Sequence, residues 1–121
     1  MASLDEATPV FRDILGLKLL GVEDVPDQMV KVAKFEVGDV KIELIEPTSA
    51  DSPISKFLEK RGQGIHHIAY RTDDIEKTIE EITANGARMI DESPRIGAGG
   101  VKIAFVHPKS TAKVLTEICE V

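Results

Sequence analysis

The sequence is poor in the residues that build covalent or aromatic cores: one cysteine, no tryptophan and one tyrosine among 121 residues. The lone Cys119 excludes an internal disulfide and a zinc site made of cysteines, and it is typical of a reducing compartment. Because only four phenylalanines remain, the core must consist mainly of Ile, Val, Leu and Ala side chains. A chain of this length fits one globular domain.

Positive charge is also scarce, since 15 Lys and Arg residues stand against 21 Asp and Glu residues, for a formal net charge of -6. The basic residues are scattered, so we expect no nucleic acid partner. No apolar run reaches the roughly 18 residues of a membrane span, and the first ten residues, MASLDEATPV, lack the features of a secretory signal. We therefore expect no membrane partner and a cytoplasmic location.

Apolar periodicity predicts a helix followed by three strands in the first half. Ser3 and Glu6 have the spacing of a capping box, and apolar residues follow at helical intervals until Gly16. Beyond that helix, β-branched stretches bounded by Gly or Pro predict strands at residues 17–25, 29–37 and 40–47. A Ser-Pro pair then opens a predicted short helix at residues 54–62.

The second half has the same order with one more strand at its start. Residues 65–71 are strand-like, and Asp73-Asp74 caps an amphipathic helix that ends at Asn85-Gly86. Three further strands are predicted at residues 88–94, 101–108 and 114–121.

This shared order predicts a duplicated βαβββ unit whose first copy lacks its opening strand. Residues 40–47 also echo residues 101–108 in sequence. We predict a single α+β domain over residues 1–121, in which the two modules form an open, curved mixed sheet of the glyoxalase-like kind. Its predicted parts are module one at 1–50, a linker helix at 51–63 and module two at 64–121.

Three polar residues interrupt apolar strands: Glu43, His67 and Glu117. Any one of them alone is more often a solvent-facing glutamate or an edge histidine. Together they fall at related places in the two halves, and imidazole and carboxylate groups are normal ligands for Zn, Co, Mn or Ni. Strand alternation puts His67 and His66 on opposite faces, so we expect only one of the two histidines to face a given pocket.

Three segments resemble the methylmalonyl-CoA epimerases of the vicinal oxygen chelate superfamily, which includes glyoxalase I. They are GIHHIAYRTDDIE at 64–76, KIELIEPTSADSPISKFLEKRG at 41–62 and ESPRIGAGGVKIAFVHPKS at 92–110, and the resemblance covers essentially the whole chain. It implies that Glu43, His67 and Glu117 bind a divalent metal ion (Co, Mn, Ni or Zn), with Glu117 as the catalytic residue near the transferred proton. It further implies a homodimer that interconverts (R)- and (S)-methylmalonyl-CoA through a metal-stabilised enolate.

The sequence departs from the family pattern at two places. Family members begin with a strand that carries a first ligand histidine, in a pattern like DHIAIAV, and the repeat places its counterpart before Met1. Either the natural start lies upstream, or the chain is truncated or redesigned, or a neighbouring chain supplies the strand. We expect weak activity or none unless that strand is present. In addition, some members carry a second proton-transfer glutamate near Val32, where this chain has none.

The remaining candidates are assigned to substrate binding, each beside a structural alternative. The Gly-rich segment allows backbone to approach a substrate, or it simply forms a hairpin loop. The His-Pro-Lys-Ser segment offers a hydrogen-bond donor and a cation, or it is a polar turn. These residues are Gly99, Gly100, His107, Lys109 and Ser110. Two other functions stay open: a glyoxalase-type lyase or isomerase, and a non-catalytic small-molecule-binding protein.

Overall fold

Each half of the chain builds its own sheet, against which helices pack. The computed structural model describes all residues from Met1 to Val121, and its contacts divide it into two units, Met1–Gly64 and Ile65–Val121. Because each unit has an internal sheet and an internal core, the two are described separately.

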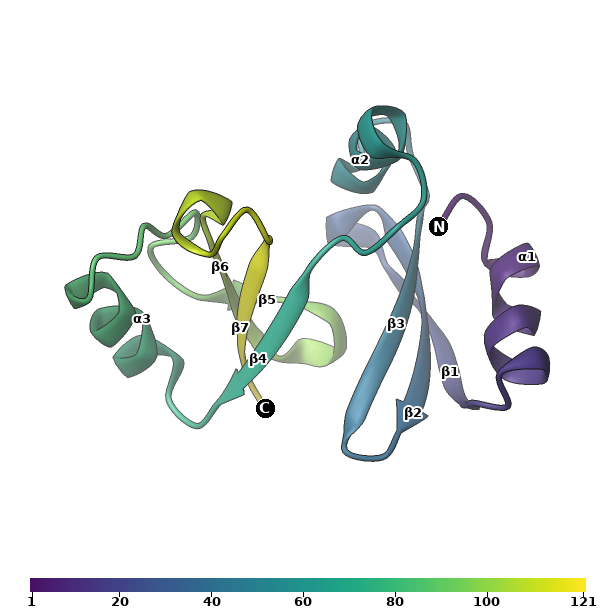
Figure 1. Ribbon diagram of the computed structural model, residues 1–121, viewed down its shortest axis with the longest axis horizontal. Helices are drawn as coiled ribbons and strands as arrows, with labels where there is room; N and C mark the ends of the chain where they lie inside the picture. Colours follow the sequence, from purple (N-terminus) through teal and green to yellow (C-terminus); the bar gives the residue numbers. More distant parts are fainter. The chain divides into compact units, whose positions relative to one another are not determined.

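The first unit begins with helix α1 (Leu4–Pro9), which packs beside an antiparallel sheet ordered β1-β2-β3 (Figure 1). Its other elements are β1 (Lys18–Val25), a 3-10 turn (Pro26–Gln28), β2 (Val30–Val37), β3 (Val40–Pro47) and α2 (Pro53–Arg61). All three predicted strands and the second helix are therefore confirmed to within a few residues.

Strand β2 is buried on both of its faces, which explains why its apolar residues do not simply alternate. Ala33 and Phe35 pack with Leu4 of α1, whereas Val30 and Val32 pack with Ile54 of α2. The central strand thus links two small cores, one under each helix.

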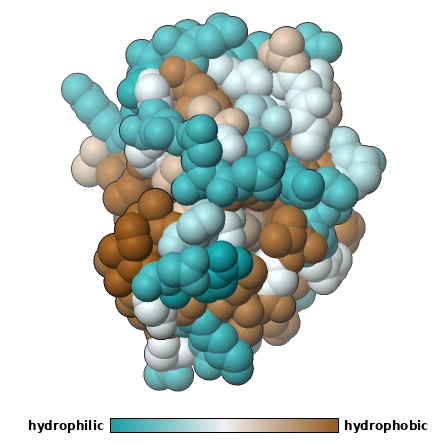
Figure 2. All heavy atoms as spheres, turned by 90° about the vertical axis from the view of Figure 1, so that its right-hand side faces the viewer, coloured by the Kyte–Doolittle hydropathy of each residue, from teal (hydrophilic) through white to brown (hydrophobic).

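The first helix is shorter than predicted. Ser3 accepts the N–H of Glu6 at 3.3 Å, as the capping box required, but the α-helix ends at Pro9 and continues as a π-helical turn, Val10–Ile14. Since Pro9 lacks an N–H, the regular ladder cannot pass through it, and a wider turn follows. Figure 2 faces this side of the unit and shows apolar side chains gathered in its lower part. Ile14, Leu15 and Val22 are among the exposed apolar residues of this unit.

The second unit has four strands in the order β4-β7-β6-β5, and helix α3 covers one face of this sheet (Figure 1). The elements are β4 (Ile68–Thr72), α3 (Ile75–Ala84), β5 (Arg95–Ile96), β6 (Lys102–Val106) and β7 (Thr116–Glu120), with 3-10 turns at Ala98–Gly100 and Pro108–Ser110. Strand β4 runs parallel to β7, and the other pairs are antiparallel. The sheet is therefore mixed, as predicted, and the α+β class is confirmed.

The predicted strand at residues 88–94 is wrong. Only an isolated bridge between Met89 and Val106 forms there, and the short β5 follows at Arg95. Both Ile90 and Asp91 donate their N–H groups to the carbonyl of Phe105, while a carboxylate oxygen of Asp91 accepts the N–H of Phe105 at 2.8 Å. A side chain thus takes the place of a backbone acceptor, and the regular ladder is interrupted.

The two sheets share one topology, since β1-β2-β3 corresponds to β5-β6-β7 in order and direction. Strand β3 is therefore the counterpart of β7, and the sequence echo between residues 40–47 and 101–108 does not mark equivalent strands. The parallel strand β4 of the second sheet has no counterpart in the three-stranded first sheet. The boundaries of the single predicted domain stay a prediction.

None of the helices is long and apolar enough to cross a membrane.

Candidate functional site

The second unit brings two of the predicted site residues into contact. Nε2 of His67 lies 3.0 Å from Oε2 of Glu117, and their side chains are only 16% and 14% exposed. The two atoms are a basic imidazole nitrogen and a carboxylate oxygen, and both are of the kind that accepts a proton or ligates a metal ion. An imidazole and a carboxylate, both largely shielded from water, therefore lie in direct contact.

The parallel pairing of β4 with β7 creates this contact. Ile68, the first residue of β4, pairs with Thr116, and Ala69 pairs with Glu117. His67 precedes the strand by one residue and so projects beside the same face as Glu117. Since Ala104, Val106 and Ile118 pack against α3, strand alternation directs Glu117 to the face opposite α3.

The ring of Phe105 forms part of the same face. Phe105 pairs with Glu117 across β6 and β7, and its ring meets that of His67 edge-on, with centroids 5.4 Å apart. An apolar wall beside the imidazole limits the positions that its ring can adopt. The apolar run at residues 103–106 gave no signal that distinguishes Phe105, and only the register places it next to Glu117.

The two histidines do not point away from each other as alternation predicted. Nδ1 of His66 lies 2.9 Å from Nδ1 of His67, and the rings are perpendicular with centroids 5.1 Å apart. Both residues precede β4, so the pleat of a strand does not govern their side chains. One of the two nitrogens must donate to the other, which makes His66 a direct orienting partner of His67.

The third predicted ligand, Glu43, lies in the first unit with a different partner. It occupies β3 opposite Lys34 of β2, and Lys34 Nζ lies 3.8 Å from its Oε1 and 3.4 Å from Glu23 Oε2. The side chain of Glu43 is 36% exposed. Lys34 did not emerge from the sequence as a site residue, although its register opposite Glu43 makes it the nearest cation to that carboxylate.

The predicted substrate-binding residues flank strand β6 at its two ends. Gly99 and Gly100 precede the strand with φ values of 72° and 75°, whereas His107 and the turn that contains Lys109 and Ser110 follow it. A strand of this length separates the two groups by roughly 20 Å. They therefore cannot all surround one small acyl group, and a long ligand is needed to reach both.

Two residues of the second group have structural roles in the turn. Nδ1 of His107 accepts the N–H of Lys109 at 3.1 Å, and Oγ of Ser110 accepts the N–H of Arg88 at 2.9 Å. These contacts stabilise the 3-10 turn after β6 and its link to the loop that follows α3. Substrate binding by these residues stays a prediction.

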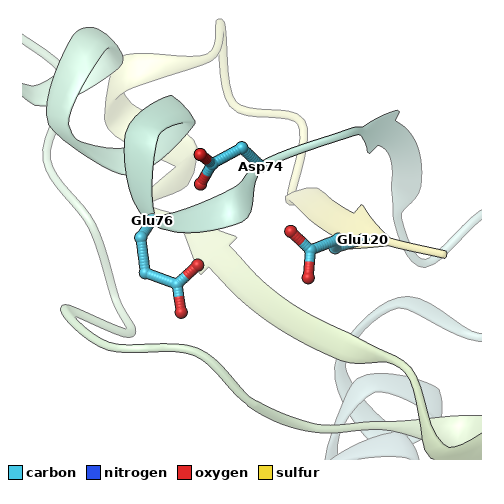
Figure 3. A group of neighbouring side chains, drawn as sticks. All are labelled: Asp74, Glu76 and Glu120. Atoms are coloured by element: carbon cyan, nitrogen blue, oxygen red, sulfur yellow. The ribbon is translucent and has the colours of Figure 1, made fainter.

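A cluster of three acidic residues that the sequence did not predict as a site lies at the start of α3. Figure 3 shows the carboxylates of Asp74 and Glu76 around the first turn, with Glu120 approaching from β7. Asp74 accepts the N–H of Lys77 and Glu120 that of Ile75, both at 3.1 Å. Lys102 lies 3.4 Å from Glu76 and 3.8 Å from Glu120. Helix capping and ion pairing thus account for all three carboxylates.

Comparison with known proteins finds relatives that align with nearly the whole chain. The family model for the Glyoxalase/Bleomycin resistance protein/Dioxygenase superfamily matches residues 1–105. An uncharacterised protein of Bacillus subtilis, YqjC, is 46% identical over 98% of this chain and 84% of its own length. The ethylmalonyl-CoA/methylmalonyl-CoA epimerase of Cereibacter sphaeroides is 38% identical over 98% of this chain and 90% of its own length.

A solved structure shares the fold closely. A methylmalonyl-CoA epimerase in complex with methylmalonyl-CoA and an ammonium ion superimposes with a TM-score of 0.91 at 34% identity, covering 98% of this chain and 86% of that one.

Proposed function

The chain belongs to the glyoxalase/bleomycin resistance protein/dioxygenase superfamily, and we propose that it is an epimerase that interconverts (R)- and (S)-methylmalonyl-CoA. Relatives named as epimerases of such thioesters cover nearly the whole chain, and the epimerase structure matches its fold. The observation that carries the proposal is the shielded contact between His67 and Glu117, because it supplies a positioned basic group on the sheet face opposite α3.

The reaction moves one proton. The carbon that bears it lies between a thioester and a carboxylate, so removal of the proton builds negative charge on the thioester oxygen. A positioned carboxylate within hydrogen-bond reach can accept the proton. We assign this role to Glu117, whose second oxygen is not engaged by the 3.0 Å contact with His67.

His67 keeps the carboxylate of Glu117 in place. Its ring is held between Nδ1 of His66 on one side and the edge of Phe105 on another. A base whose orientation is determined before substrate arrives loses little entropy on reaction. His66 and Phe105 therefore act as positioning residues, through His67.

The donor set suits a divalent metal ion. Two ligand atoms at adjacent positions, each about 2.1 Å from a metal, lie roughly 3 Å apart, and His67 Nε2 and Glu117 Oε2 are 3.0 Å apart. We propose Glu43 of the first unit as a further ligand, for Co, Mn, Ni or Zn. Bound by these residues, the ion would act as a Lewis acid toward the charge that develops on the substrate oxygens.

The proposal extends to assembly and location. We propose a homodimer, which would cover some of the apolar side chains that the first unit leaves exposed, such as Ile14 and Leu15. Light scattering coupled to size-exclusion chromatography measures the assembly, and a monomer at micromolar concentration would contradict the proposed homodimer.

We also propose that the protein works in the cytoplasm on an acyl-CoA.

Proton exchange tests the central claim. Racemic methylmalonyl-CoA is incubated in D2O, and loss of its α-proton signal is followed by NMR. We expect Glu117→Gln to slow the enzyme-dependent exchange by roughly 10² to 10⁴-fold, since an amide cannot accept the proton. Glu120→Gln is the matched control, because Glu120 lies on the same strand but caps α3, and its amide can still accept that hydrogen bond.

Equal exchange rates for Glu117→Gln and wild-type protein would refute the assignment of the base. A wild-type protein that leaves the α-proton in place but isomerises the hemithioacetal of glutathione and methylglyoxal would refute the epimerase proposal in favour of a glyoxalase.

A further inference from the structure

The face that carries His67 and Glu117 also holds an arginine. Arg95 of β5 pairs with Ile103 of β6, so its side chain shares the face of Ile103 and of Phe105 two residues further on. Its guanidinium carbon lies 5.6 Å from the centre of the Phe105 ring. One phenyl ring is thus in contact with both the imidazole of His67 and the guanidinium of Arg95.

Arg95 is held by an acidic partner that is itself fixed. Nε of Arg95 lies 3.4 Å from Oδ1 of Asp91, whose side chain is 19% exposed. The other oxygen of Asp91 accepts the backbone N–H of Phe105 at 2.8 Å. The aspartate is therefore anchored to the sheet, and it restrains the guanidinium against the phenyl ring.

The contact with Asp91 does not use the two Nη groups of Arg95, which are the N–H donors available for an anion. The Arg95 side chain is 48% exposed, on a face that no helix of this unit covers. A planar fork of N–H donors that is already oriented is well suited to bind a carboxylate through two hydrogen bonds.

We infer that Arg95 binds the carboxylate of the substrate and thereby selects malonyl-type thioesters over simple acyl-CoA thioesters. The inference rests on the proposed function, which it makes more specific. In the substrate the carboxylate is bonded directly to the carbon that loses its proton. An arginine that holds this carboxylate, one phenyl ring away from His67, orients the carbon toward the side of the face where Glu117 lies.

A guanidinium also binds phosphate, so the test must separate the carboxylate from the phosphates of coenzyme A. Malonyl-CoA and acetyl-CoA share the coenzyme and differ by the carboxylate, and epimerisation of malonyl-CoA gives no new product. Their dissociation constants are measured by calorimetry with the metal-loaded protein. We expect wild-type protein to bind malonyl-CoA at least tenfold more tightly than acetyl-CoA.

Arg95→Met should lower this preference by roughly tenfold, because it removes a charged bidentate contact. Arg95→Lys should restore part of the preference, since it returns the charge without the fork. The matched control is Arg61→Met, which removes a guanidinium 6.0 Å from the ring of Phe57 in the first unit and should leave the preference unchanged.

Two results would overturn the inference. One is an unchanged preference in Arg95→Met, with Arg95→Lys equal to it. The other is equal weakening of both thioesters, which would assign the arginine to a phosphate of the coenzyme. If wild-type protein bound neither thioester, the proposed function would itself be refuted, and the role of Arg95 with it.

Discussion

Each unit has a glutamate at the corresponding position of the same strand topology, but the partner residue and the exposure of the two glutamates differ. Glu43 and Glu117 lie in the last strand of their sheets, on the faces away from α1 and α3 respectively. Glu43 faces a lysine at 3.8 Å and is 36% exposed. Glu117 faces a histidine at 3.0 Å and is 14% exposed.

The difference comes from the strand beside each glutamate. In the second unit, β4 lies parallel to β7 and delivers His67 to Glu117. The first sheet has three strands, and there Glu43 faces Lys34 of β2, which also lies 3.4 Å from Glu23 of β1. A repeated topology therefore reproduces the position of a residue, whereas the neighbouring strand determines its chemistry.

The largest effect is expected on stability. Truncation of a core side chain should lower the free energy of unfolding by a similar amount in either unit. Phe35 and Ile75 are both 0% exposed, so truncation leaves a cavity in either unit. Phe35→Ala should lower the free energy of unfolding by about 3–5 kcal/mol and Ile75→Ala by about 2–5 kcal/mol. Urea denaturation measures both, with Val40→Ala at an exposed position as the control, expected within about 0.5 kcal/mol of wild type. A loss below about 1 kcal/mol in one unit would show that this unit has no tightly packed core.

A smaller effect is expected on metal affinity. A substitution in the second unit should weaken Mn²⁺ binding, whereas one in the first unit should tighten it. His67→Gln should weaken the binding of Mn²⁺ by about 10 to 100-fold, because it removes a proposed ligand. Lys34→Met should tighten it by up to about fivefold, since loss of an exposed ion pair frees the carboxylate of Glu43. Calorimetric titration measures both.

Lys31→Met is the matched control for the lysine, because Lys31 lies on the other face of the same strand. Weaker Mn²⁺ binding in Lys34→Met would mean that the lysine supports the ligand instead of competing with the ion.

Among the changes in stability, the smaller effect is expected at the hairpin glycines, where the cost has a different cause in each unit. A Cβ at Gly97 would lie 2.8 Å from Cδ1 of Ile103, which is 4% exposed and cannot easily move. Gly97→Ala should therefore cost about 1–3 kcal/mol through overpacking. Gly38 has φ +60° with open space around it, so Gly38→Ala should cost only about 1 kcal/mol, through backbone strain.

Thermal unfolding compares these two variants. If Gly38→Ala proved the more harmful, backbone conformation would outweigh packing at both turns.

Local signals predicted most of the fold. The helix caps at Ser3 and Asp74 form as their spacing indicated, because capping depends on residues only three positions apart. The strand at 88–94 failed for the opposite reason. Asp91 bonds to Phe105, fourteen residues away, and no local pattern reveals such a partner.

For the candidate site, too, local sequence signals predicted some features, and strand register determined the others. Composition and strand patterns singled out His67 and Glu117, since a polar residue in an apolar strand is visible in the sequence itself. Their contact depends on the parallel register of β4 and β7, and the meeting of His66 with His67 depends on where that strand begins. Arg95 gave no signal, because its position over Phe105 follows from hairpin register and from Asp91.

By itself, therefore, the sequence determined where most of the helices and strands lie, the repeat of one unit, and the two residue types that carry the proposed chemistry. Only the tertiary structure decided that His67 pairs with Glu117 while Glu43 pairs with Lys34, and that Arg95 lies over Phe105. The physical reason is range: caps, turns and periodicity act between near neighbours, whereas strand register brings together side chains that are distant along the chain.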